Sequence, residues 1–379
     1  MKLSSTFAVA RMPFLRPTFF RPVCSSSNSN SISCSSSPSP SFSCSLQVKP
    51  RTPLFLRPPI FSTPLSDIIK WHNWAKDLAA SVGSSFAHLD NGPDSTLLCR
   101  ELKWLLEDSL EDHSLISRLD VENNSLDVKL RTSVDQLYDL WRQRIQERRP
   151  FQYIVGCEHW RDLVLCVQEG VLIPRPETEL IVDLVKDVIL NNEGLAEGLW
   201  ADLGTGSGAI ALGIAGILGT QGRVVATDLS PVAVAVAAYN VHRYHQDKIE
   251  VRKGSWFEPV TDMEGKLAGV ISNPPYIPAD DISGLQAEVG KHEPRLALDG
   301  GTTGMDDLLH LINGAALMLK PGGFFAFETN GEKQCKFLKD HMEHNYPGSF
   351  CNVKIVSDFA EFVLRDEKRK GQVLLGIPG

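Results

Sequence analysis

From residue 199 onward, short runs rich in β-branched and aromatic residues alternate with segments of helical periodicity. This alternation predicts an α/β fold with a doubly wound, mostly parallel sheet, because parallel strands need a crossover connection that a helix supplies. Such sheets bind their ligands outside the carboxyl ends of the strands. The expected strands are Leu199–Leu203, Val224–Leu229, Ile249–Val251, Gly269–Ile271 and Phe324–Glu328, with helices ending at Leu218 and Val241 and a further helix over Asp306–Leu319.

A glycine-rich run follows the first expected strand and opens a helix. Glycine at every second position removes the Cβ atom where the chain turns, so the N–H groups at the start of the helix can approach a ligand closely. This pattern alone is a weak signal, since dinucleotide-binding folds and plain tight turns share it. The candidate cofactor-binding residues of this turn are Gly204, Thr205, Gly206, Ser207 and Gly208.

Asp228 ends the next expected strand, twenty positions after Gly208. An acid at this place can accept hydrogen bonds from both hydroxyls of a ribose, and such bonds to a charged group are worth about 1.5–3 kcal/mol each. The alternative is that Asp228 caps the helix that starts near Pro231, although Ser230 already offers a cap. Together with the glycine run, Asp228 indicates a nucleoside-binding site.

The tetrapeptide Asn273-Pro274-Pro275-Tyr276 follows the strand Gly269–Ile271 and supplies the candidate catalytic residues. Two prolines fix the backbone, so the Asn273 side chain and the Pro274 carbonyl are held as two acceptors for one NH₂ group, and Tyr276 can pack against its flat face. An amide nitrogen is a poor nucleophile because its lone pair is delocalised. Acceptors on its hydrogens would orient that lone pair and favour the charge that develops, without a strong base. The alternative is a double-proline turn that ends a strand.

Residues 1–62 are expected to be a transit peptide or a disordered leader. Residues 1–66 contain seven of the 38 basic residues and no acid, and thirteen serines lie between Ser25 and Ser45. An acid-free, serine-rich composition is typical of organelle transit peptides, and the dominance of serine favours a chloroplast over a mitochondrion. The alternative is a disordered serine-rich tail. Without this stretch, 31 basic residues face 46 acidic ones, so the body of the protein carries about −15 charges.

Three further segments complete the expected domain organisation. Residues 63–150 show helical periodicity with an aromatic stripe that is expected to be core, residues 151–172 alternate like a β-hairpin linker with strands at 153–155 and 163–165, and residues 173–379 form the expected catalytic domain. No apolar run approaches the roughly 20 residues of a membrane helix. The cysteines beyond the leader lie far apart, without a CxxC pair or a histidine at ligand spacing, so we expect neither a disulfide framework nor a metal site.

Four segments together resemble the HemK/PrmC family, the glutamine-N5 methyltransferases of peptide-chain release factors. They are VLIPRPETE at 171–179, DLGTGSGAIAL at 202–212, SNPPYI at 272–277 and HEPRLALDGG at 292–301. The resemblance extends from about Arg149 to about Val363. Asn-Pro-Pro-Tyr alone is shared with adenine-N6 methyltransferases, whereas the first and last segments are far more particular to this family.

The resemblance implies a Rossmann-like class I methyltransferase fold, S-adenosylmethionine as donor, and a class I release factor as partner, methylated on the glutamine of its Gly-Gly-Gln motif. It implies that residues 204–208 line the cofactor, that Asp228 binds its ribose and that Ser255-Trp256-Phe257 flanks its adenine. It also implies that residues 273–276 hold the glutamine, with Asn273 contributing to the cofactor site as well. For Trp256 a core position is the alternative. The segment 175–179 is expected at the lip of the site without a role in the chemistry. In the final hairpin, Asp358–Arg365 departs from the family pattern.

Two other functions use the same features. A nucleic-acid N-methyltransferase would grip the amino group of a flipped adenine or guanine in the same way, but the acidic body disfavours phosphate contacts, so no stable nucleic-acid binding is expected. A non-catalytic adaptor would show degraded glycines or a lost Asn-Pro-Pro-Tyr, and neither is seen. The helical domain is then the expected element for recognising a protein substrate.

Overall fold

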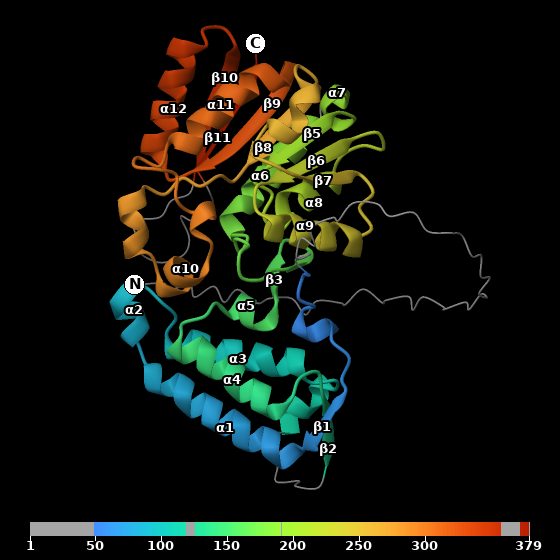
Figure 1. The fold of residues 1–379 in the computed structure, drawn as a ribbon, viewed down its shortest axis with the longest axis vertical. Coiled ribbons are helices and arrows are strands. Elements are labelled where there is room, and N and C mark those ends of the chain that lie inside the picture. Colours follow the sequence, from blue (N-terminus) through green and yellow to red (C-terminus); the bar gives the residue numbers. More distant parts are fainter. Residues whose placement is uncertain (1–48, 119–125, 191, 358–371, 379) are drawn as a thin grey trace, which may run out of the picture. The chain divides into compact units, whose positions relative to one another are not determined.

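The computed structural model describes residues 49–118, 126–190, 192–357 and 372–378 (Figure 1). These residues all fall within one unit of the fold, Gln47–Gly379. Most of the expected leader and the divergent segment Asp358–Arg365 lie outside the described residues. Among the described residues, no helix has both the length and the apolar character needed to cross a membrane.

A seven-stranded sheet forms the centre of the catalytic domain, in the order β10-β11-β9-β8-β5-β6-β7. Strands β5 to β9 are parallel, and β10 and β11 add an antiparallel edge, which confirms the expected doubly wound, mostly parallel sheet. The chain winds from β5 to β7 in one direction and then returns to place β8 on the other side of β5, so the strand order reverses between β5 and β8. The strands are β5 (Leu199–Leu203), β6 (Arg223–Asp228), β7 (Ile249–Lys253), β8 (Leu267–Ser272), β9 (Leu319–Thr329), β10 (Phe350–Ser357) and β11 (Gln372–Pro378).

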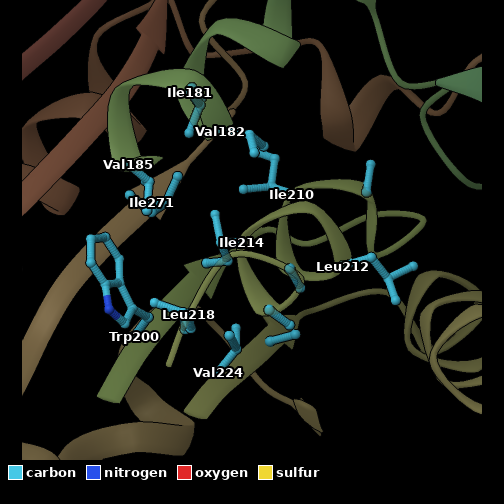
Figure 2. Packing of buried hydrophobic residues seen from close by; sticks show 14 of the residues in the cluster. Ile181, Val182, Val185, Trp200, Ile210, Leu212, Ile214, Leu218, Val224 and Ile271 are labelled. Atoms are coloured by element: carbon cyan, nitrogen blue, oxygen red, sulfur yellow. The ribbon is translucent and has the colours of Figure 1, made fainter. Parts of the chain in front are cut away.

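Helices cover both faces of this sheet. On one face, Ile181, Val182 and Val185 of α6 and Ile210 and Ile214 of α8 pack with sheet residues such as Trp200 and Ile271 (Figure 2). On the other face, α11 and α12 bury Leu308, Leu311, Ile312, Leu338 and Met342 against the sheet. All six residues of β8 are buried, as a central parallel strand requires. The helices are α6 (Glu179–Ile189), α7 (Glu193–Ala196), α8 (Ala209–Ala215), α9 (Pro231–Arg243), α10 (Ala287–His292), α11 (Asp306–Met318) and α12 (Glu332–Asn345).

The N-terminal domain contains the expected helices, with Trp71 and Trp141 fully buried in its core. It is not purely helical, because β1 pairs with β2 in an antiparallel ladder. It also begins before the predicted boundary at residue 62, since Leu54 is fully buried in the same core. Its elements are η1 (Leu54–Leu56), β1 (Phe61–Pro64), α1 (Leu65–Val82), α2 (Ser85–Asp90), α3 (Ser95–Ser109), η2 (His113–Arg118), β2 (Asp127–Leu130) and α4 (Val134–Gln146).

The expected hairpin linker is correct only in its second strand. The predicted first strand at 153–155 is instead part of helix α5 (Phe151–Val155), and the hairpin consists of β3 (Cys157–Trp160) and β4 (Leu163–Cys166). Pro150 suits the start of a helix because it needs no N–H partner there. Gly156 ends the helix with a left-handed backbone, φ +81°. These two residues outweigh the β-branched composition of the short run between them.

Candidate active site

A cavity of about 350 Å³ opens at the carboxyl ends of β5, β6, β7 and β8. This is the place that the reversal of strand order predicts for a ligand. Most of the residues proposed from the sequence line it: Gly204, Thr205, Gly206, Ser207, Asp228, Trp256, Asn273 and Pro275. Gly208, Pro274 and Tyr276 are not among the lining residues. The volume lies within the range of about 300–1,000 Å³ that is usual for small-molecule sites.

The glycine turn has the backbone that its sequence predicts. Gly204, Gly206 and Gly208 all have positive φ angles, of 73°, 57° and 84°. A Cβ atom on Gly204 would lie 3.2 Å from the Trp256 ring, so a side chain there would crowd the cavity wall. Gly208 instead forms the N-cap of α8 and lies against Ala237. The turn therefore presents bare backbone to the cavity at Gly204 and Gly206, while Gly208 serves the helix.

Asp228, at the end of the neighbouring strand β6, is hydrogen-bonded to the glycine turn. Its Oδ2 accepts a hydrogen bond from the Gly206 N–H at 2.9 Å, and its Oδ1 accepts one from the Ser230 N–H at 2.8 Å. The cap of α9 is Ser230, whose hydroxyl accepts from the Ala233 N–H, so Asp228 does not serve as the cap. Burial raises the pKa of Asp228, although these backbone donors favour its charged form. Its carboxylate lines the cavity beside the bare turn, and this arrangement fits the ribose of a nucleoside.

Asp202 is a fully buried residue behind the glycine turn that the sequence reasoning did not single out. Its Oδ2 accepts hydrogen bonds from the Thr205 hydroxyl at 2.6 Å and from the Ala211 N–H at 3.0 Å. Its Oδ1 is buried without a hydrogen-bond partner, and burial raises the pKa of its carboxyl to about 7. Asp202 thus ties the glycine turn to the first turn of α8. An acid directly before a glycine-rich turn is the signal that could have identified it.

Trp256 packs on the core and also lines the cavity, while its contact with an adenine stays a prediction. Its backbone is left-handed, with φ 44°, which is uncommon for a bulky residue. The Thr227 hydroxyl donates a hydrogen bond to the Trp256 carbonyl at 3.2 Å. Its side chain also bonds to Asp307, a cavity residue near the start of α11 that the sequence reasoning missed. The indole is therefore fixed as the wall of the cavity beside Gly204.

Asn273 stands directly after β8 and lines the cavity from the strand next to the glycine turn. Its Nδ2 donates a hydrogen bond to the Thr178 hydroxyl at 3.0 Å, so its Oδ1 is the atom left to accept a bond. Pro274 is buried and Pro275 lines the cavity. The Tyr276 hydroxyl donates to Glu328 Oε1 at 2.9 Å instead of entering the cavity. Burial raises the pKa of Tyr276 well above its ordinary value.

The chemical character of the cavity follows from these residues. One side has the bare backbone of the turn after β5 and the Asp228 carboxylate at the end of β6, and the other side has the Asn273 side chain after β8, the strand on the opposite side of β5. Within the described residues, no group of three or more metal-ligating side chains gathers. The fold and the site define a class I S-adenosylmethionine-dependent methyltransferase.

Comparison with known proteins places this class more narrowly. The family model "Methyltransferase small domain" matches residues 179–288. The chain is 39% identical over 265 residues to the release factor glutamine methyltransferase of Synechocystis sp., covering 69% of this chain and 83% of that protein. It is 41% identical over 202 residues to the protein of that name from Thermosynechococcus vestitus, covering 53% of this chain and 68% of that one. The chain belongs to the release factor glutamine methyltransferase family.

Proposed function

We propose that this enzyme methylates the side-chain nitrogen of the glutamine in the Gly-Gly-Gln motif of a class I release factor in an organelle, and so tunes translation termination. The observation that carries the proposal is the position of Asn273, which lines the same cavity as the glycine turn and donates its Nδ2 hydrogen to Thr178, so that its Oδ1 is the atom left to accept. The names of the relatives support a release factor as the substrate.

The roles of the residues follow from their positions. Bound S-adenosylmethionine supplies an electrophilic methyl group. The turn at Gly204 and Gly206 and the carboxylate of Asp228 hold the nucleoside. Asn273 Oδ1 and the Pro274 carbonyl accept the two hydrogens of the glutamine NH₂ group. These acceptors turn the nitrogen lone pair toward the methyl group and stabilise the positive charge that develops on nitrogen, a preorganised effect that needs no strong base in the transfer step. The sulfur keeps the electron pair of its broken bond to the methyl carbon, and the nitrogen then loses one proton to water to give the neutral N-methyl amide.

The test is methyl transfer from labelled S-adenosylmethionine to a plastid class I release factor by the full chain. We expect one methyl group on the factor, located by mass spectrometry on the Gly-Gly-Gln glutamine. A factor with that glutamine replaced by asparagine is the matched control and should remain unlabelled. Label on RNA or DNA with none on the factor would show that the enzyme is a nucleic-acid methyltransferase. Label on the control factor would place the methyl group elsewhere.

The chloroplast is the proposed location, with the mitochondrion as the alternative. The support is the composition of residues 1–66, which have no acid and many serines. A fusion of these residues to a fluorescent protein should accumulate in plastids of plant cells, whereas the fluorescent protein alone should stay in the cytosol. Mitochondrial signal would favour the alternative, and diffuse cytosolic signal would contradict an organellar location.

A further inference from the structure

A buried chain of hydrogen bonds links the two ends of the Asn-Pro-Pro-Tyr segment. Asn273 Nδ2 donates to Thr178 Oγ1 at 3.0 Å, and Thr178 Oγ1 donates to Glu328 Oε2 at 2.7 Å. The other carboxyl oxygen, Glu328 Oε1, accepts from the Tyr276 hydroxyl at 2.9 Å. Thr178 and Glu328 are each only 3% exposed. The sequence reasoning gave neither residue a role.

We propose that Thr178 and Glu328 are positioning residues, which set the orientation of the Asn273 carboxamide so that its oxygen faces the substrate amine. This inference rests on the proposed grip of Asn273 on an NH₂ group. It gives a function to the segment at 175–179, which was expected only at the lip of the site. In this account Asn273 contacts the substrate amine, Thr178 lines the cavity beside it, and Glu328, which is not a lining residue, acts through both.

The direction of the hydrogen bonds gives the proposal its physical basis. A threonine hydroxyl has one hydrogen to donate, and here that hydrogen is directed to Glu328. Thr178 can therefore only accept from Asn273. If the carboxamide turned over, Asn273 Oδ1 would face the Thr178 oxygen without a hydrogen between them, and the NH₂ group would point at the amine of the substrate. Both contacts would be repulsive, so Thr178 selects one of the two orientations.

The supports of Thr178 and Glu328 are rigid. In the paired strands β8 and β9, Ser272 lies opposite Phe327, so Glu328 follows in register with Asn273. The segment before Thr178 is fixed by a hydrogen bond from Trp160 Nε1 to the Arg175 carbonyl at 2.7 Å and by the ion pair of Arg175 with Glu293. Glu293 also accepts from the Ile173 N–H at 3.1 Å. The family-like segments at 171–179 and 292–301 therefore contact each other here and hold Thr178 in place.

The experiment compares Thr178→Val, which removes the hydroxyl and keeps the shape, with Thr178→Ser, which restores the hydroxyl. We expect Thr178→Val to lower kcat for methyl transfer about 10- to 100-fold, as a slight misplacement of a reacting group does. Thr178 also lines the cavity, and valine keeps its shape there, so we expect KM for the release factor to stay within about threefold of the wild-type value. Thr178→Ser should recover most of the rate, and Thr261→Val, at an exposed threonine, is the matched control.

A second readout needs no protein substrate and so separates this proposal from the proposed function. With ¹⁵N-asparagine labelling, the NH₂ resonances of the Asn273 side chain are identified by their loss in Asn273→Ala. We expect them to be resolved and slow to exchange with solvent in the wild type and in Thr178→Ser, but averaged or fast to exchange in Thr178→Val. S-adenosylmethionine titration of each variant shows that its site is folded. Unchanged resonances together with an unchanged kcat in Thr178→Val would overturn the proposal.

Discussion

Asn273→Ala is expected to lower kcat for methyl transfer by about 10²- to 10³-fold, the usual cost of removing one preorganised polar contact to a developing charge. The substitution deletes the only side-chain acceptor of the tetrapeptide that lines the cavity. The glycine turn and Asp228 remain in place, so the Kd for S-adenosylmethionine should change by less than about threefold. Single-turnover rates and calorimetric titration of the donor measure the two quantities separately.

The matched control is Asn345→Ala, an exposed asparagine at the end of α12 that is absent from the cavity lining. It should leave both quantities unchanged. Asn273→Asp keeps the size and one acceptor oxygen, but it loses the hydrogen bond donated to Thr178 and gains a charge. Its rate should fall between those of the wild type and Asn273→Ala. If donor affinity fell as steeply as kcat in Asn273→Ala, Asn273 would act by holding the cofactor and the proposed grip would be wrong.

Arg144→Ala is expected to lower the free energy of unfolding by about 3–5 kcal/mol, because it leaves the buried Glu101 carboxylate without its partner and removes one of the two arginines that pair with Glu288. Arg144 donates to Glu101 at 2.6 and 3.1 Å and to Glu288 at 2.9 Å. All three residues are at most 7% exposed. Urea denaturation of the wild type and the variant at pH 7.5 measures the difference. Arg142→Ala, on the same helix, is the control, since its ion pair with Asp139 is exposed and is worth at most about 1 kcal/mol.

The loss of unfolding free energy in Arg144→Ala should be smaller at acidic pH than at neutral pH. Burial already raises the pKa of Glu101 above its ordinary value, and Arg144 opposes that shift. Without Arg144, the folded state disfavours the charged carboxylate still more. The loss of stability is therefore largest at neutral pH, where Glu101 must stay charged in the unfolded chain but is disfavoured as a charge in the folded one. It decreases as the pH falls toward 4.5, the ordinary pKa of the group, because the folded state then binds a proton on Glu101. An equal loss at pH 5 and pH 7.5, or a loss no larger than that of Arg142→Ala, would contradict this account.

The same cluster of charges joins the helical domain to the segment after the tetrapeptide. Arg148, just beyond α4, pairs with both Glu288 and Asp90, and Asp90 accepts from the Ala287 N–H at 2.9 Å. Glu288 and Ala287 belong to α10. Pro294, which follows α10, lines the cavity. The helical domain thus supports one wall of the site, in addition to the substrate recognition expected of it.

Much of the fold could be predicted because it depends on local patterns. The alternation of strands and helices after Leu199 indicates a sheet that is covered by helices on both faces. The glycine turn and Asp228 could be predicted because each follows or ends one of two successive strands. The run Tyr153–Val155 was misread as a strand because three apolar residues are too few to show a period, and its flanking Pro150 and Gly156 decide the outcome.

The parts of the site that escaped prediction are held by contacts between residues far apart in the sequence. Thr178 and Asn273 are 95 residues apart, and Thr178 and Glu328 are 150 apart. A buried threonine or glutamate has no periodicity that reveals its partner. Only the folded sheet shows that the carboxyl ends of β8 and β9 meet the start of α6. Glu101 and Glu288 were hidden for the same reason, since a charged residue on a helix is ordinarily exposed.

In the proposed arrangement, the pairing of β5 with β8 sets the spacing between the donor site and the acceptor site. Leu203, the last residue before the glycine turn, lies opposite Ser272, the last residue before Asn273. Neighbouring strands are about 4.7–4.9 Å apart, so the attachment points of the donor site and the acceptor site are spaced by the main-chain hydrogen bonds of two central, buried strands. To change that spacing, the enzyme would have to unpair the middle of its sheet. The loops around the site can therefore differ in sequence to admit different substrates, while the distance between the donor site and the acceptor site stays constant.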